Sequence, residues 1–219
     1  MLQNPEVQEK LGILKEKSKT TGEQGINIAM DGTPSAIIDG EDHEVELGDS
    51  AGNKGGYHNH TPTGIPMLSP PDILKLFNYA MNFNNGNVGE AFKGIVGSDV
   101  CSACPSGYKY YHYLVRFNGT YQELANLVYA NWDKDMYIRT YQRRYNELKK
   151  NSEYYDSQLG VVNNKGLEKL FFDTLKTMNI ENKVILQRVD ETGTAPHINY
   201  SVQNITLDEN NKPRATPCP

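Results

Sequence analysis

Residues 56–72 read Gly-Tyr-His-Asn-His-Thr-Pro-Thr-Gly-Ile-Pro-Met-Leu-Ser-Pro-Pro-Asp. His58 and His60 stand two positions apart, and the two-residue period of a strand points both imidazoles to the same face. Asp72 follows at the expected start of a helix. Two imidazoles and one carboxylate leave the fourth tetrahedral position of a zinc ion open, which distinguishes catalytic from structural zinc sites. We therefore predict a metal site with His58, His60 and Asp72 as its ligands.

The residues before that helix have a second interpretation. Ser69 stands where a helix cap is expected, Pro70 begins the first turn, and Asp72 is the acid three residues after the cap. This capping pattern alone explains the aspartate without any metal. The two interpretations are compatible, because an aspartate in the first helical turn can face an ion held by a neighbouring strand.

Helical and strand patterns surround this stretch. Apolar residues three to four positions apart predict helices, and alternating apolar residues between turn dipeptides predict strands, including one with Val45 and Leu47 on the same face. The elements predicted before residue 119 are a helix over 5–17, short strands between 25 and 47, a helix from about residue 70, and strands over 91–96 and 108–117.

The second half of the chain has a different character. Thr120 and Glu123 form a capping-box pattern at the start of a helical region, and Asp133-Lys134-Asp135 is expected to divide this region into two helices. A regular helix is predicted around residues 167–178, followed by late strands over 184–189 and 197–207. We predict an α+β protein whose mixed sheet is flanked by helices. Its expected parts are a metal-site domain over 1–119 and an α-rich extension with late strands over 120–219.

The motif His-x-His followed by Ser-x-x-Asp, carried by His58, His60, Ser69 and Asp72, resembles the JAMM (MPN-type) zinc metalloproteases, which include deubiquitinating isopeptidases and bacterial relatives. Glu23, followed by Gln24, Gly25 and Ile26, matches the upstream glutamate of that family. The resemblance covers roughly residues 18–120 at the level of motifs. Eight residues separate His60 from Ser69, one more than the family pattern has.

The resemblance implies a fold, a cofactor and a role for each matching residue. The fold would be a cytidine-deaminase-like α/β/α sandwich, and the cofactor would be Zn2+ held by His58, His60 and Asp72. Glu23 would act as the general base, with a pKa nearer neutrality than that of a free glutamate. Ser69 would donate a hydrogen bond to the developing oxyanion. The substrate would be a peptide or protein, including conjugates of a ubiquitin-like modifier.

Other assignments stay open at this point. Glu44 or Glu46 could replace Glu23 as the base. His43, His112 and His197 are expected to lie outside the site. The alternative function is a non-catalytic interaction or assembly module, of the kind found in phage tails, secretion systems or toxins, that keeps a degenerate metal loop. Its contact surface would be the tyrosines of residues 108–113 and of the following helices, since tyrosine is favoured at interfaces.

Charge and hydropathy exclude some classes of partner. The formal net charge of −5 argues against nucleic acid, because phosphate binding needs a concentrated basic face. No apolar run approaches the ~20 residues of a membrane span. We expect a soluble chain that is cytoplasmic or delivered as the C-terminal part of a longer exported protein.

Three cysteines provide no disulfide framework. Cys101 and Cys104 have the spacing of half a zinc knuckle, but no second pair of ligands follows within the usual distance. A local disulfide and two ordinary loop thiols are the interpretations that remain. Cys218 lies in a tail that is expected to be disordered.

Overall fold

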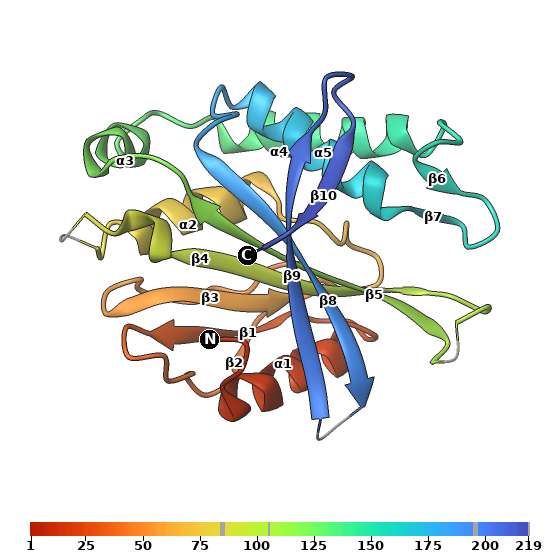
Figure 1. Cartoon of the computed structure of the whole chain (residues 1–219), viewed down its shortest axis with the longest axis horizontal. Helices are drawn as coiled ribbons and strands as arrows, with labels where there is room; N and C mark the ends of the chain where they lie inside the picture. The colour runs from red at the N-terminus through yellow and green to blue at the C-terminus, as the bar shows by residue number, and fades with distance from the viewer. Residues whose placement is uncertain (84–85, 105, 195–196, 219) are drawn as a thin grey trace.

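The computed structural model describes residues 1–83, 86–104, 106–194 and 197–218. Across these residues the chain forms one mixed sheet of eight strands and five α-helices (Figure 1). It is an α+β protein, as the sequence predicts. The strands of this sheet are β1 (Gln24–Ala29), β2 (Ile38–Asp39), β3 (Asn53–Asn59), β4 (Phe92–Val100), β5 (Tyr108–Phe117), β8 (Val184–Thr194), β9 (His197–Leu207) and β10 (Pro213–Pro217).

The strand order is β10-β9-β8-β5-β4-β3-β1-β2. Among the described pairs of this sheet, β3 and β4 run parallel and the other neighbours run antiparallel. A parallel pair needs a crossover, and here a helix supplies it. Residues 56–72 therefore span the end of β3, the connection that follows it and the first turn of this crossover helix.

Several helices begin directly after a polar residue whose side chain caps the helix N-terminus. Asn4 caps the first helix through the backbone N–H of Glu6, and Asp133 caps the fourth through that of Met136. Thr120 and Glu123 form the predicted capping box. The elements outside the large sheet are α1 (Pro5–Lys17), α2 (Pro70–Ala80), the short 3-10 helix η1 (Val88–Glu90), α3 (Tyr121–Val128), α4 (Lys134–Leu148), the hairpin of β6 (Tyr155–Asp156) and β7 (Val161–Val162), and α5 (Asn164–Thr177).

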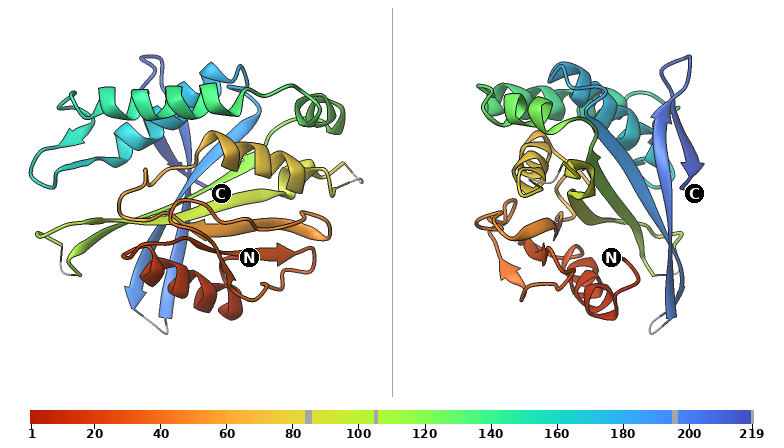
Figure 2. Two further views of the ribbon diagram at one scale, coloured as in Figure 1. Left: turned by 180° about the vertical axis from the view of Figure 1, so that it is seen from behind. Right: turned by 60° about the vertical axis from the view of Figure 1, so that its left-hand side comes forward.

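The two faces of the sheet carry separate cores. On one face α1 packs its buried Val7, Leu11 and Leu14 against β1, β3 and β4. The helices α2 to α5 gather over the other face, where Phe77 and Phe171 lie in the larger core. Figure 2 shows this arrangement, with α1 between the edge strands near the N-terminus and the long ends of β8 and β9. Apolar burial on both faces explains why β4 is buried over most of its length.

One predicted strand is wrong. Val45 and Leu47 do not pair with any described strand. Leu47 is buried, but a Cβ on Gly25 would lie 2.5 Å from its side chain, so Leu47 packs on top of β1 instead of beside it. Its carbonyl accepts a hydrogen bond from the Asn27 side chain, which uses the backbone group that a ladder would need.

The structure decides between the two interpretations of Cys101 and Cys104 and corrects the prediction for the tail that contains Cys218. Cys101 and Cys104 form a disulfide at the end of β4, the first of the two interpretations left open by the sequence. The expected disorder of residues 216–218 is wrong, because β10 pairs with β9 and the N–H of Cys218 donates to the carbonyl of Val202 at 3.0 Å, whereas Pro219 lies outside the described residues. Residues 216–218 are ordered since the sheet offers them an unpaired strand edge.

The second half of the chain is joined to the first through the sheet. β8 pairs with β5 from Phe117–Val184 to Tyr113–Arg188, and β9 and β10 extend the same sheet outward. The division between 1–119 and 120–219 stays a prediction. None of the helices in the described part of the chain has the length and apolar character needed to cross a membrane.

Candidate metal centre

The two histidines are held at the end of β3. The N–H of His60 donates to the carbonyl of Val96 at 2.8 Å, so the pairing of β3 with β4 continues one residue beyond the strand itself. Both rings therefore point to the face covered by α2, as the two-residue period predicts. Their Nε2 atoms lie 2.9 Å apart, and both residues are buried.

Asp72 approaches the same point from the first turn of α2. Its Oδ2 accepts hydrogen bonds from the backbone N–H of Ser69 at 2.8 Å and from the Ser69 hydroxyl at 2.7 Å. Its Oδ1 lies 3.4 Å from Nε2 of His58, and its Oδ2 lies 3.8 Å from Nε2 of His60. The helix-capping and metal-facing interpretations thus hold together, because the bonds to Ser69 fix the orientation of the carboxylate.

These three side chains fit a divalent ion. Their candidate ligand atoms all lie within 4.8 Å of one another. Bonds of about 2.0–2.2 Å in a tetrahedral zinc site place neighbouring ligand atoms about 3.3–3.6 Å apart. The two Nε2 atoms are 2.9 Å apart, Nε2 of His58 is 3.4 Å from Oδ1 of Asp72, and Nε2 of His60 is 3.8 Å from Oδ2, so the observed separations lie on both sides of that range. His58, His60 and Asp72 therefore form a buried group that can bind a metal.

The hydrogen bond on the other ring nitrogen of His60 is also compatible with metal binding through Nε2. Its Nδ1 faces the carbonyl of Ile65 within hydrogen-bond distance, and a carbonyl can only accept. The ring therefore carries its proton on Nδ1 and leaves the lone pair of Nε2 toward His58 and Asp72. Metal-bound histidines commonly donate their other N–H in this way.

Lys93 is the residue of this site that the sequence reasoning missed. It lies on β4, in register with Gly56 of β3, and is 3 % exposed. Its Nζ lies 2.8 Å from Nδ1 of His58 and 3.9 Å from Oδ1 of Asp72. The signal in the sequence was a lysine between Phe92 and Ile95, in a strand with few other polar residues. A lysine at such a position is ordinarily assigned to a solvated face.

The charges at the centre follow from burial. Burial lowers the pKa of His58 well below its usual value and lowers that of His60, so both rings are neutral at neutral pH. Burial also lowers the pKa of Lys93 to about 8, against the attraction of Asp72 and Glu23. For Asp72, burial acts to raise the pKa, but His58, Lys93, His60 and the Ser69 hydroxyl outweigh it and the pKa falls below its usual range. Since the rings are neutral, Lys93 is the charge that balances Asp72 at pH 7.

Glu23 stands immediately before β1, beside the same group. Its backbone pairs with Gly40 and Glu41, and the residue is 6 % exposed. In the described part of the chain no hydrogen bond or ion pair satisfies its carboxylate. Burial, with repulsion from Asp72, raises the pKa of Glu23 to about 8. The shift is in the direction that a general base working near neutrality requires.

Asn59 fixes the position of Glu23. Its side-chain oxygen accepts from the N–H of Gln24 at 2.7 Å, and its amide donates to the carbonyl of Gly22 at 3.4 Å. The fully buried Asn59 thus holds the backbone on both sides of Glu23 against β3. The two-residue period of the strand likewise predicts that Asn59 points to the face opposite His58 and His60.

The alternative bases Glu44 and Glu46 and two of the remaining histidines lie outside the group of His58, His60 and Asp72. Glu44 and Glu46 are exposed, although the charge of Glu44 contributes to the raised pKa of Glu23. His43 is exposed and its Nδ1 lies 3.2 Å from the Thr61 hydroxyl. His112 is buried on the α1 face, and the side chain of His197 lies outside the described part of the structure.

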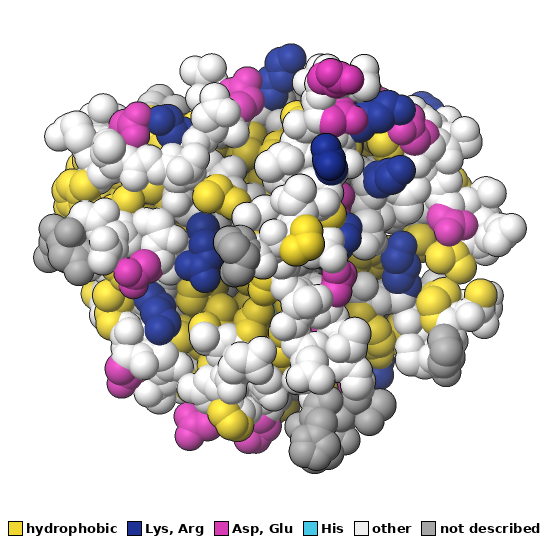
Figure 3. Space-filling view, viewed as in Figure 1, with side chains coloured by type: hydrophobic (Ala, Val, Ile, Leu, Met, Phe, Trp, Pro, Cys, Tyr) yellow, Lys and Arg dark blue, Asp and Glu magenta, His cyan; other side chains and the backbone are white. Residues whose placement is uncertain are grey.

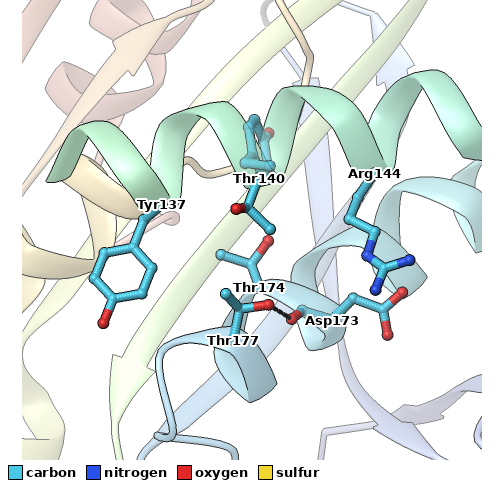
Figure 4. Close-up of a pocket in the computed structure, with 7 residues that line it drawn as sticks. Tyr137, Thr140, Arg144, Asp173, Thr174 and Thr177 are labelled. Carbon is cyan, nitrogen blue, oxygen red and sulfur yellow. Dashed lines mark hydrogen bonds between the residues drawn. The ribbon is translucent and has the colours of Figure 1, made fainter. Parts of the chain in front are cut away.

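A hollow elsewhere on the molecule contains none of these residues. It lies between α4 and α5 (Figure 4). Tyr141 in its wall has its hydroxyl directed to the carbonyl of Met67, in the loop between His60 and α2. The hollow is lined by Tyr137, Thr140, Tyr141, Arg144, Asp173, Thr174 and Thr177.

Comparison of the chain with models of known protein families gives no match, and comparison with curated proteins gives none either. The case for a function therefore depends on the geometry of the centre.

Proposed function

We propose that this chain is a zinc-dependent hydrolase that cleaves a peptide or isopeptide bond. The observation that carries this proposal is the convergence of His58, His60 and Asp72 in a buried group, beside the unpaired carboxylate of Glu23. Three protein ligands leave one tetrahedral position for water or substrate, the arrangement of hydrolytic zinc sites. A structural site would use a fourth protein ligand instead.

The arrangement of β3, α2 and β4 supports the JAMM-like, cytidine-deaminase-like fold within this proposal. Two parallel neighbouring strands are joined through α2, the histidines end the first strand, and the aspartate opens the helix. A helix also covers each face of the sheet at this point. This is the succession that the motif resemblance implies.

The proposed chemistry divides the work among the residues of the chain. His58, His60 and Asp72 would hold the ion, and zinc bound there would lower the pKa of water to about 7 and polarise a carbonyl. Glu23 takes the proton from the attacking water and returns it to the leaving amine, which is general base and then general acid catalysis by one group. Its buried position excludes competing partners for that proton.

Ser69 has a second task in this scheme. Its hydroxyl has one proton, which is directed to Oδ2 of Asp72. To donate to an oxyanion, the hydroxyl must rotate away from Asp72 during the reaction. The backbone N–H of Ser69 keeps its own bond to Oδ2 and holds the carboxylate meanwhile.

The expected substrate is a peptide or protein, including one joined to a lysine through an isopeptide bond. Nucleic acid is not expected, given the net charge of −5. On the face shown in Figure 3, lysine and arginine side chains are interspersed with acidic ones and do not gather in one patch. This supports the same expectation.

The experiment is hydrolysis of a panel of peptides and ε-lysine isopeptides by the zinc-loaded chain, with and without a chelator. Cleavage should stop on chelation and return with zinc. Glu23→Gln should abolish cleavage while zinc stays bound, and His60→Ala should lose both. The matched control is Glu44→Gln, which removes a nearby exposed carboxylate and should cleave normally. Undiminished cleavage by Glu23→Gln would assign the base to another residue.

One observation supports the alternative function, an interaction module. Tyr129, after α3, is 82 % exposed and Tyr121 is 40 % exposed. Three of the tyrosines predicted to form a contact surface, Tyr111, Tyr113 and Tyr141, are instead buried. These three are not available for binding, whereas the exposed tyrosines around α3 are.

A further inference from the structure

Lys93 places a fixed positive charge where a metal ion is expected to supply one. We propose that the Lys93 ammonium is an internal counter-cation of the metal centre, which stabilises the site before an ion binds and weakens the binding of the ion. This inference rests on the metal centre of the proposed function. It adds a residue that sets the affinity of the site.

The first argument is electrostatic. The carboxylate of Asp72 is buried, and His58 and His60 beside it are neutral, because His58 accepts at Nδ1 from Lys93 and His60 accepts at Nε2 from His58. Lys93 Nζ, 3.9 Å from Oδ1 of Asp72, is the cation closest to this carboxylate among the described ion pairs. A buried charge that loses its partner is strongly destabilising, because burial removes the solvation that would compensate it. Lys93 therefore supports the carboxylate when no other cation does.

The second argument comes from the hydrogen bonds of the rings. A charged ammonium has only donors, so the contact of 2.8 Å makes Nδ1 of His58 the acceptor. A neutral imidazole then carries its proton on Nε2, which lies 2.9 Å from Nε2 of His60. His60 in turn donates from Nδ1 to the carbonyl of Ile65. Lys93, His58, His60 and Ile65 thus form one continuous chain of donors and acceptors.

This chain of hydrogen bonds opposes metal binding. A ligand must present a lone pair, and in this arrangement Nε2 of His58 carries a proton. Binding of an ion through that nitrogen requires the contact with Lys93 to be rearranged. A divalent ion between Asp72 and His58 would also be repelled by the ammonium beside both residues. The same side chain therefore favours the metal-free protein and disfavours the metal-bound one.

Lys75 on α2 provides a matched comparison. It is a second lysine near the site, and its charge acts on Lys93. Its Nζ, however, donates to the carbonyl of Gly48. No described contact joins it to His58, His60 or Asp72. Removing Lys75 subtracts the same charge as removing Lys93 but leaves the hydrogen bonds of the rings unchanged.

The test compares wild type, Lys93→Met and Lys75→Met, each titrated with zinc in competition with a chromophoric chelator. Methionine approximates the length of the lysine stem without its charge. We expect Lys93→Met to bind zinc at least about ten-fold more tightly, a change of the size that partners of metal ligands produce. Its thermal midpoint without zinc should fall, and its rise on adding zinc should exceed that of wild type. Lys75→Met should change affinity by less than about three-fold, since it keeps the contacts of the rings.

An equal or weaker affinity in folded Lys93→Met overturns the inference, as does an equal gain in Lys75→Met. If Lys93→Met does not fold without zinc, the double variant Asp72→Asn with Lys93→Met decides the case. It should fold without zinc, because both buried charges are gone, and failure to fold while Asp72→Asn alone folds contradicts the inference.

The zinc titrations distinguish failure of the metal centre from failure of the role of Lys93. Zinc binding by wild type with an unchanged affinity in Lys93→Met removes only the role of Lys93. Absence of zinc binding in both proteins removes the metal centre and this inference with it. Binding that appears only in Lys93→Met supports the inference and contradicts zinc hydrolysis by the native chain.

Discussion

Glu23 and Glu191 are two glutamates withdrawn from water on the two sides of one sheet, and their surroundings are opposite. On the α1 face, Glu191 pairs with Lys15 at 2.5 Å and lies 3.4 Å from Nδ1 of His112. Burial acts to raise its pKa, but these partners lower it to about 2. On the α2 face, Glu23 has no such partner in the described structure, and burial raises its pKa to about 8.

The difference separates a buried carboxylate with cationic partners from one without them. A paired buried carboxylate lowers the energy of the folded state and holds its charge down to low pH. An unpaired one makes the folded state less stable and keeps its proton near neutrality, which is useful only where a proton must be moved. Under the proposed function, the carboxylate on the α1 face contributes to stability and the one on the α2 face moves a proton.

The largest expected effect is on catalysis. Glu23→Gln should lower the hydrolysis rate by roughly 10²–10⁴-fold, the usual contribution of a general acid–base group. Glu191→Gln should leave the rate of hydrolysis near that of wild type, because its contacts lie on the opposite face. The measurement is kcat for the best substrate of the panel, with bound zinc determined for each variant. Similar losses in both variants would break the contrast between the faces.

The largest expected effect on stability comes from packing on the α1 face. A Cβ on Gly94 would lie 2.0 Å from the fully buried ring of Tyr57. The ring is enclosed by Phe92 and His112, so it has no room to move. Gly94→Ala should cost roughly 3 kcal/mol of unfolding free energy, at the upper end of overpacking effects. Denaturant unfolding would measure it.

The matched control for Gly94→Ala is Gly12→Ala. Gly12 lies inside α1, and a Cβ there meets nothing within 4 Å. Alanine should therefore stabilise the protein by about 0.5–1 kcal/mol, the difference in helix propensity. A loss of stability in both variants would mean that the α1 face tolerates no change at all, rather than that Tyr57 needs the space over Gly94.

The pH dependence of stability should differ in sign between the two glutamates. The pKa of Glu191 falls from 4.5 to about 2 on folding, so its contribution is fully present above pH 4.5 and is lost as the pH falls toward 2. Glu191→Gln should cost about 1–3 kcal/mol at pH 7 and progressively less below pH 4.5. Urea midpoints across this range would measure the convergence of the two proteins.

For Glu23 the sign reverses. Its pKa rises from 4.5 to about 8 on folding, so the folded state retains a proton that the unfolded state has lost. Stability therefore falls as the pH rises from 4.5 to 8 in zinc-free protein. Glu23→Gln should remove this slope, and the variant should be the more stable protein at pH 8. A slope that persists in the variant would place the titrating group elsewhere.

The sequence predicted that His58, His60 and Asp72 lie together because their placement follows from local rules. The strand period sets His58 and His60 on one face, and the Ser-Pro-Pro-Asp cap sets Asp72 in a first helical turn. The boundaries of α1 and β5 were predictable for the same reason, since apolar spacing and turn residues mark them. These features depend on neighbours in the chain.

The features that could not be predicted depend on distant contacts. Lys93 resembles a solvated strand residue until α2 covers its face and places Asp72 beside it. Leu47 alternates with Val45 as in a strand, but it fills the space above the glycines of β1 and β3. Asn59 positions Glu23 through backbone atoms 35 and 37 residues away in the chain. Such contacts arise only from the tertiary fold.

Elemental analysis of protein purified without added zinc would show whether His58, His60 and Asp72 hold a metal ion. We expect about one zinc ion per chain in wild type, and none in a His60→Ala variant that remains folded by circular dichroism. Wild-type protein that is free of metal and cannot be loaded with zinc would rule out the metal centre, as would an equal zinc content in His60→Ala.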